Sequence, residues 1–464
     1  MKGKARPQSL VHHLTLAERY AEGKRLREQC PRSSHAIWKA PRDRPDPVAL
    51  VLEADRGRIP ELLPLRHGRM SVSPFTFYRG TALNMAADLA TTPATGVRVQ
   101  CCGDAHLGNF RGFATPERRV IFAINDLDET LPAPWEWDIK RLGASLVIAC
   151  RDNDLGDSTA RDAVLLCAAA YREHMAELSE MRVLDVWYRA IDKDQVVPTI
   201  EHARTRRRMA RRLEKARRRT VAEDVFPKLA TGSGMSAVFK AAPPTIFHFP
   251  GHRPGEIDEA VVDAFSHYRA TLPTSPGQLL DRFERMDAAS KVVGVGSVGT
   301  ATWMLLLMAG EGDPLILQAK EARASVLEAF AGKSRFRNHG ERVVTGHRLM
   351  QPASDMLLGW SEAADGRHYY LRQLRDAKIK FPVEDFSAAE MRIFARWCGH
   401  SLAISHARSG DPALISGYLG KGDPFDRALA SFSVAYADQT EKDYAAYERA
   451  IRDGRVEAVV EKEG

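Results

Sequence analysis

Hydrophobic and polar residues alternate with two different periods in the first third of the chain. Residues 97–102 (VRVQCC) alternate and carry β-branched side chains, which predicts a strand. Residues 118–126 (RRVIFAIND) predict a second strand, separated from the first by a polar loop that contains a proline. Residues 135–153 carry an apolar stripe at helical spacing, which predicts a helix with one buried face. Residues 73–96 predict a turn and then a helix that ends at a proline and a glycine.

The pattern changes twice in the remainder of the chain. It predicts mostly helices over 155–285, strands from 289 and helices again from 386. Together these elements predict an α+β fold. We divide the chain into an N-terminal helical arm (1–60), a part with two strands and a helix (61–150), a helical part (151–288), a β-rich part (289–380) and C-terminal helices (381–464).

Composition is that of a globular protein, since 44% of the 464 residues are hydrophobic and 27% are charged. No apolar run reaches the length of a membrane span, and the N-terminus lacks the apolar core of a secretory signal. We therefore expect a cytoplasmic protein with no membrane contact. The six cysteines contain no C-x-x-C pair, which argues against zinc and disulfides and predicts buried, reduced thiols.

Residues 103–110 (GDAHLGNF) follow the first predicted strand and carry the most specific chemistry. Asp104 and Asn109 lie five residues apart. In kinase-type phosphotransfer a carboxylate accepts the proton of the attacking hydroxyl, and an amide of the same loop holds Mg²⁺ against the nucleotide phosphates. Asp126 ends the second strand, and Asp128 is the alternative to it. If the two strands pair, this carboxylate would lie close to Asn109 and complete the oxygen ligands of Mg²⁺. The competing interpretation is that Asp104 and Asn109 only cap a turn.

A second motif, GVGSVG at 294–299, fits G-x-G-x-x-G. In a hairpin turn of this kind, backbone N–H groups face phosphate oxygens. A dinucleotide fold requires a helix directly after the glycines, whereas Thr300, Thr302 and Trp303 favour a strand. A glycine-rich turn within a core sheet is the third possibility. The residues expected to line a phosphate site are Gly294, Gly296, Ser297 and Gly299.

Lys320 ends a later strand, where a kinase-like site would place it against the α- and β-phosphates. An acid on a following helix would hold this lysine, and the spacing does not separate Glu328 from Glu341. HYYLRQL predicts a strand that leads to the adenine side, with Arg372 and Gln373 near the cleft.

Arginine is concentrated in two places. The stretch 203–220 has a net charge of +9, whereas the whole chain has a net charge of +7. The remaining residues therefore have a net charge of −2. It predicts a solvated face, or contact with an acidic partner or a nucleic acid. Arg66, Arg69 and Arg79 flank SPFTFY, where they would bind an anionic substrate or phosphate, or form salt bridges within the fold.

The series GDAHLGNF, FAINDLDET and WEWDIKRL resembles the motifs of aminoglycoside phosphotransferases and choline kinases. The resemblance implies that Asp104 is the catalytic base and that Asn109 and Asp126 bind magnesium. It also implies that Asp138 braces the catalytic loop and that His106 orients it. One position departs from the pattern, because Cys102 stands where these families usually have histidine.

Nearly the whole chain is also similar to an uncharacterised bacterial family, domain of unknown function 2252. RMSVSPFTFYRG, INDLDETLPAPWEWDIKRL, YYLRQLRDAK, SHARSGD and YADQTEKDY carry this second resemblance.

These motifs lead us to expect a two-lobed, protein-kinase-like fold and a phosphotransferase that uses ATP and Mg²⁺ on a hydroxyl of a small or macromolecular acceptor. Kinases place the glycine loop before the catalytic loop, so the reversed order predicts a circular permutation. A Lys320 farther from Asp104 than the span of a triphosphate would exclude it. The alternatives are a catalytically weak nucleotide-binding regulator, a nucleic-acid-associated protein and a dinucleotide-dependent oxidoreductase. The sequence indicates neither the acceptor nor an oligomeric state.

Overall fold

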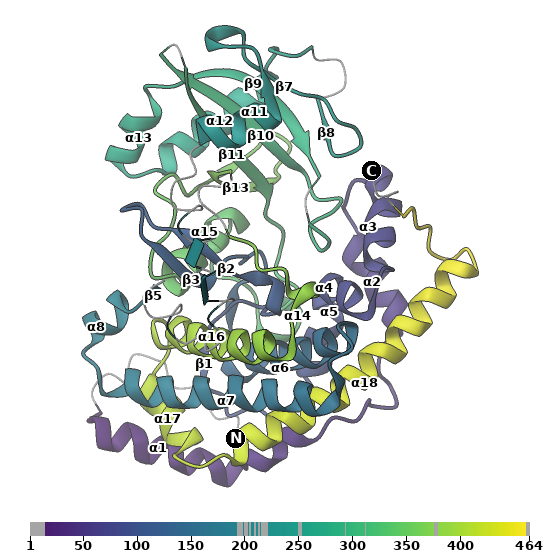
Figure 1. Cartoon of the computed structure of the whole chain (residues 1–464), viewed down its shortest axis with the longest axis vertical. Coiled ribbons are helices and arrows are strands. Elements are labelled where there is room, and N and C mark those ends of the chain that lie inside the picture. Colours follow the sequence, from purple (N-terminus) through teal and green to yellow (C-terminus); the bar gives the residue numbers. More distant parts are fainter. Residues whose placement is uncertain are drawn as a thin grey trace.

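The computed structural model describes residues 14–192, 221–248, 253–292, 294–310, 312–374 and 379–460, with scattered residues between 193 and 220. The arginine-rich stretch 203–220 therefore lies mostly outside the described residues. The chain forms a sheet-rich part stacked on a helical part (Figure 1), which confirms the α+β class.

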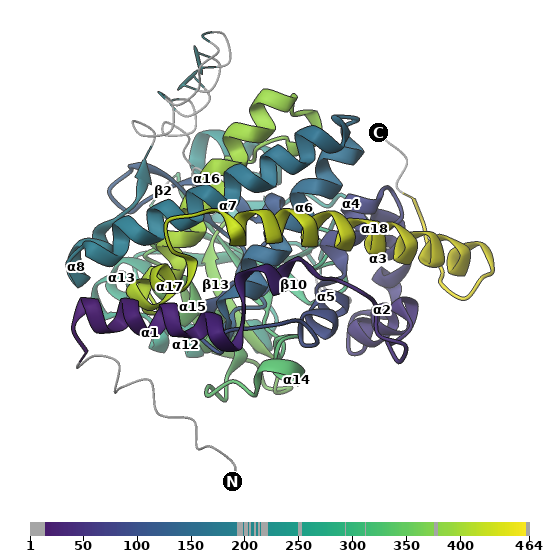
Figure 2. The ribbon, with the colours of Figure 1, turned by 90° about the horizontal axis from the view of Figure 1, so that it is seen from below.

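The helical part is built around α6 (Trp135–Asp152), whose predicted apolar face is buried. It packs against α7 (Gly156–Glu180), α16 (Ala388–Ala407) and α18 (Pro424–Arg452). Figure 2, which views the molecule from below, shows α18 running across the helical part. Residues from both ends of the chain thus share one core with the middle. The other helices of this part are α1 (Leu16–Gln29), α2 (Pro47–Asp55), α3 (Leu63–Met70), α4 (Pro74–Gly80), α5 (Ala82–Leu89), α8 (Val183–Tyr188) and α17 (Pro412–Leu419).

Both strands predicted in the first third form, but they do not pair with each other. β1 (Arg98–Cys101) pairs with β4 (Leu131–Pro134). β3 (Val120–Ile124) pairs with β2 (Phe110–Ala114) and β5 (Ile191–Asp192). The expected pairing was wrong because β2 and β3 are consecutive and close a local hairpin, which is the easier antiparallel partnership to form.

The sheet-rich part contains a six-stranded sheet of order β12-β13-β11-β10-β9-β8. The residues after the glycine motif form strand β10, as the β-branched pattern predicts, so the helix that a dinucleotide fold requires is absent from residues 294–310. The strands are β8 (Ile246–Phe247), β9 (Glu284–Lys291), β10 (Thr302–Ala309), β11 (Asp313–Glu321), β12 (Gly359–Glu362) and β13 (His368–Gln373).

Segments that precede the sheet in sequence cover both of its faces. Side chains of β10 alternate, so Leu305 and Leu307 pack with α12 (Glu259–Thr271), whereas Met304 and Leu306 pack with residues 225–246. The predicted boundary at 289 is therefore too late, because residues from 221 onward share the cores of the sheet. Elements of this part also include α11 (Phe226–Leu229), β6 (Ala230–Thr231), β7 (Val238–Phe239), α13 (Thr274–Leu280), α14 (Glu328–Ala331) and α15 (His339–Met350).

Two further expectations bear on the whole chain. All six cysteines are buried and unpaired, which confirms the thiol prediction. Within the residues that the structure describes, no helix is both long enough and apolar enough to span a membrane.

His35 joins the N-terminal arm to the C-terminal helices and makes folding sensitive to acid. It is fully buried and lies 2.7 Å from the Tyr418 hydroxyl. Burial, followed by the nearby Lys140 charge, lowers the pKa of His35 to about 3. The unfolded chain binds this proton below its ordinary pKa of about 6.5, so the stability contributed by neutral His35 is complete above that pH and falls as the pH drops towards 3.

We expect the free energy of unfolding to fall between pH 7 and pH 5, with about 2 kcal/mol due to His35. Urea denaturation of His35→Gln should therefore show a smaller difference between the two pH values. His267→Gln, a change at an exposed histidine on α12, is the control and should behave like the wild type. Equal acid sensitivity of His35→Gln and wild type would contradict the prediction.

Candidate active site

The loop after β1 is held in place by Asp138 at the start of α6. The Asp138 carboxylate accepts hydrogen bonds from the backbone N–H groups of Cys102 (2.6 Å) and Gly103 (2.9 Å). Gly103 has a φ of +81°, and a Cβ atom there would lie 2.4 Å from the carbonyl oxygen of Glu129. Only glycine fits this turn, which directs the next residue, Asp104, towards the interior of the molecule.

A chain of buried groups supports Asp138 from behind. His406 Nε2 lies 3.2 Å from Asp138 Oδ2, and His406 Nδ1 lies 2.9 Å from the Tyr171 hydroxyl. Cys102 contacts the other loop, because its Sγ donates to the carbonyl oxygen of Asp126 at 3.3 Å. The loop is thus braced by Asp138 and tied by Cys102 to the loop that carries Asp126.

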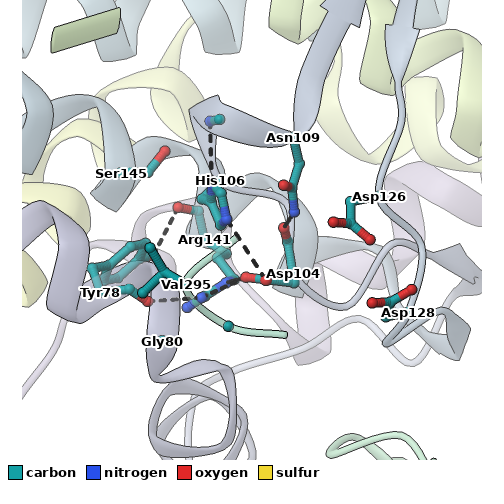
Figure 3. A network of polar contacts seen from close by, with 12 residues as sticks. Tyr78, Gly80, Asp104, His106, Asn109, Asp126, Asp128, Arg141, Ser145 and Val295 are labelled. Carbon is teal, nitrogen blue, oxygen red and sulfur yellow. Dashed lines mark hydrogen bonds and ion pairs between the residues drawn. The ribbon is translucent and has the colours of Figure 1, made fainter. Parts of the chain in front are cut away.

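Asp104 forms an ion pair with Arg141 of α6. Arg141 Nε and Nη2 lie 2.6 Å and 2.5 Å from Asp104 Oδ1. Burial raises the pKa of Asp104 to about 7, although the Arg141 charge and hydrogen bond act in the opposite direction. Figure 3 shows Asp104 between Arg141 and the two acids Asp126 and Asp128. A carboxyl that titrates near neutral pH is suited to act as a general base.

His106 and Asn109 shape the loop around Asp104. His106 is buried, accepts a hydrogen bond from Gly108 N, and has Nε2 3.7 Å from Asp104 Oδ2. Burial, with the charges of Arg79 and Arg141, holds the pKa of His106 well below its ordinary value, so the ring is neutral. Asn109 Nδ2 donates to the carbonyl oxygen of Asp104 at 2.8 Å. This bond orients the amide and leaves Oδ1 as the atom for a cation.

Asp126 and Asp128 meet Lys320 of β11. Lys320 Nζ lies 3.5 Å from Asp126 Oδ1 and 2.6 Å from Asp128 Oδ2, and the Tyr370 hydroxyl donates to Asp128 Oδ1 at 2.6 Å. Burial would raise the pKa of Asp126, but Lys320 and then Arg372 hold it well below its ordinary value. Conversely, these two carboxylates raise the pKa of Lys320 against the effect of burial. Residues almost two hundred positions apart therefore share one charged cluster.

Arginines of the helical part form hydrogen bonds with the glycine-rich loop, residues 294–299. Arg66 and Arg69 were expected either to bind an anionic substrate or to form salt bridges within the fold, and their guanidinium groups donate to carbonyl oxygens of this loop. Arg66 also forms a buried ion pair with Asp55 at 2.8 Å, so it has a structural role here. The bonds to the loop are Arg69 Nη1 to Gly294 O (2.8 Å), Arg66 Nη1 to Val295 O (3.0 Å), Arg58 Nη1 to Val298 O (2.7 Å) and Ile59 N to Gly299 O (2.7 Å).

One cavity of about 310 Å³ lies between the loop after β1 and the glycine-rich loop. We call it the central cavity. Its lining combines acids, an amide and arginines with loop residues 294–297. The predicted residues in this lining are Arg66, Arg79, Asp104, His106, Asn109, Asp126, Asp128, Gly294, Gly296 and Ser297.

Eight predicted residues do not line this cavity: Arg69, Asp138, Gly299, Lys320, Glu328, Glu341, Arg372 and Gln373. The ion pairs of Lys320 are to aspartates, whereas Glu328 lies 4.0 Å from His339 and Glu341 occupies the first turn of α15. The expected lysine–glutamate pair was wrong because the end of β11 faces the helical part, where two acids precede α6. Arg372 and Gln373 line a separate cavity of about 210 Å³ with Asn125 and Asp355, although the Arg372 charge still acts on Asp126.

The sequence reasoning missed several arginines of the site, among them Arg141 and Arg342. Arg141 lies three residues after Asp138 on α6, and residues at this spacing share one helix face, so assigning Asp138 to the loop should have pointed to Arg141 as well. Arg342 of α15 donates to the carbonyl oxygens of Asp128 (2.8 Å) and Thr130 (2.6 Å). Nothing local in the sequence marks Arg342, because its partners are more than two hundred residues away.

Asp138 and His406 also lie close to Cys101, and the ligand atoms of these three buried residues are within 4.8 Å of one another. The Cys101 thiol donates to the carbonyl oxygens of Ala133 and Pro134 at 3.5 Å, and both other side chains have the partners given above. We therefore interpret this group as the support of the loop.

A scan against family models matches residues 58–450 to the family described as "Uncharacterized protein conserved in bacteria (DUF2252)". No curated protein and no solved structure matches the chain.

Proposed function

We propose that this chain, which belongs to the DUF2252 family of uncharacterized bacterial proteins, transfers a phosphoryl group from ATP to a hydroxyl group with the help of Mg²⁺. One observation carries the proposal: Asp104, Asn109, Asp126 and the glycine-rich loop line a single cavity, and Lys320 Nζ lies 3.5 Å from Asp126 Oδ1. These are the groups that kinase-type transfer requires in one place.

The donor atoms support a magnesium site. Carboxylates of Asp126 and Asp128 and the amide oxygen of Asn109 are hard oxygen ligands, which Mg²⁺ prefers. Lys320 already supplies a positive charge between the two carboxylates. When bound, Mg²⁺ neutralises charge on the phosphate oxygens.

Asp104 is the proposed base. Arg141 occupies Oδ1, which leaves Oδ2 to accept the proton of the acceptor hydroxyl. The acceptor oxygen then forms a bond to the γ-phosphorus while the bond from that phosphorus to the ADP oxygen breaks. Arg141 keeps the carboxylate oriented, and His106 stays neutral beside it.

The order of elements supports a kinase-like small lobe placed late in the chain. The glycine-rich loop joins β9 to β10, and Lys320 lies on the next strand, β11, in the order found in kinases. The loop with Asp104 comes some two hundred residues earlier, which fits the circular permutation that we propose.

Thermal denaturation of the full chain tests the proposal. We expect ATP to raise the melting temperature only when Mg²⁺ is present, and NAD to have no effect. Asp126→Asn should lose the magnesium-dependent part, because it removes a proposed ligand, whereas Asp157→Asn, at an exposed acid on α7, should keep it. Stabilisation by NAD rather than ATP would favour the oxidoreductase and refute the proposal.

A further inference from the structure

Arg79 lines the central cavity and has no bonding partner among the residues that the structure describes. Its guanidinium is half-buried on α4, and within the described part of the chain no group forms a hydrogen bond or ion pair with it. Its Nε is shielded from solvent and unsatisfied. Unlike Arg66 and Arg69, which bond to the glycine-rich loop, Arg79 has its donors available to a ligand.

Arg111 of β2 lies on the same side of the cavity. The hydrogen bond that the structure gives it joins Nε to the carbonyl oxygen of Gly108 at 3.1 Å. Burial and then the Arg111 charge lower the pKa of Arg79, which means that the two cations repel each other in a poorly solvated place. Holding two such cations together is costly unless an anion accompanies them.

Arg79 and Arg111 lie close to the loop that carries Asp104, the proposed base. A Cβ atom on Gly108 would lie 3.5 Å from Arg79 Nε and 3.1 Å from the His106 ring, so Arg79 adjoins the loop that carries Asp104. Asp126 and Asp128 lie on the other side of Asp104, beside Asn109 (Figure 3), and Lys320 contacts these two aspartates. Asp104, Glu384 and Asp126 attract Arg79 only over distances longer than an ion pair.

We infer that Arg79 and Arg111 bind an anionic group, a phosphate or a carboxylate, on the acceptor whose hydroxyl faces Asp104. This inference rests on the proposed phosphotransfer. Guanidinium groups bind two oxygens of such an anion at once, which would orient the acceptor as well as hold it. The same charges disfavour a polycationic acceptor. The γ-phosphate of ATP is the other possible source of the anion.

Binding of inorganic phosphate, measured by calorimetry on the full chain, tests the inference. We expect phosphate to bind in the presence of saturating Mg²⁺ and a non-hydrolysable ATP analogue, and Arg79→Gln to weaken it roughly tenfold or more. Arg111→Gln should act in the same direction. Arg427→Gln, at an exposed arginine on α18 paired with Asp423, is the matched control and should bind phosphate like the wild type.

Three outcomes separate the possibilities. Phosphate binding that the ATP analogue abolishes would assign Arg79 to the nucleotide and overturn the inference. Equal phosphate affinity of Arg79→Gln and wild type would also overturn it. If the ATP analogue itself does not bind, the proposed phosphotransfer is refuted, and so is the assignment of Arg79 and Arg111 to its acceptor. The same phosphate titration without nucleotide would then show whether the two arginines bind an anion independently of phosphotransfer.

Discussion

Asp104→Asn will lower the rate of ADP release from Mg²⁺ and ATP by about 10²–10⁴-fold, the usual contribution of a positioned general base. An asparagine amide cannot accept a proton at neutral pH, yet it has nearly the shape of aspartate and keeps an oxygen for Arg141. Because Asn109, Asp126 and Lys320 are unchanged, binding of Mg²⁺ and ATP should persist. Coupled detection of ADP measures the rate, and calorimetry measures binding.

The control separates chemistry from folding. Arg141 is buried and would lose part of its ionic partner, so the melting temperature of Asp104→Asn must be measured alongside its activity. Asp157→Asn removes an acid that is 73% exposed and should leave both rate and stability unchanged. ADP release at the wild-type rate from a folded Asp104→Asn chain would show that Asp104 is not the base.

Asp138→Ala will lower the free energy of unfolding by about 3–5 kcal/mol. The side chain is buried and accepts hydrogen bonds from two backbone N–H groups, with His406 as a third neighbour. Each buried donor left without an acceptor costs about 1–3 kcal/mol. Urea denaturation measures the loss. We expect the nucleotide-dependent activity to disappear as well, because the loop that directs Asp104 is no longer braced.

Asp138→Asn makes the prediction specific. Its single amide oxygen can still accept one of the two backbone hydrogen bonds, so its stability should lie between those of the wild type and Asp138→Ala. Asp157→Ala is the exposed control. A loss below about 1 kcal/mol for Asp138→Ala, the ordinary effect of a mutation, would contradict the bracing role.

Sequence reasoning worked best where the signal is local. The alternation in 97–102 predicted β1, the apolar residues of 118–126 predicted β3, and the β-branched residues after the glycine motif predicted strand β10 instead of a helix. Sequence reasoning failed to predict which strands pair with each other. Both strands were correct, but their pairing was not, because hydrophobic alternation records which side of a strand is buried and not which strand lies beside it.

The same limit applies to ion pairs. Glu328 and Glu341 were expected to hold Lys320 from the following helices, whereas the structure pairs Lys320 with Asp126 and Asp128. Arg66 and Arg69 were predicted to bind an anion or to form salt bridges within the fold. Both donate to carbonyl oxygens of the glycine-rich loop, and no side-chain type in the sequence marks such backbone acceptors. Backbone acceptors are present at every residue, so only the fold selects which of them an arginine reaches.

By itself the sequence determined the α+β class, the loop with Asp104 and Asn109, the acids that follow β3 and the strand that ends in Lys320. Each of these depends on residues within a few positions of one another, where spacing and backbone preference decide the outcome. The tertiary structure decided that the loop at 103–109 and the loop at 294–299 line one cavity and that Arg141 pairs with Asp104. It also decided that Arg79 has no partner within the described part of the chain. Those relations depend on packing between segments far apart in the chain, which local patterns do not record.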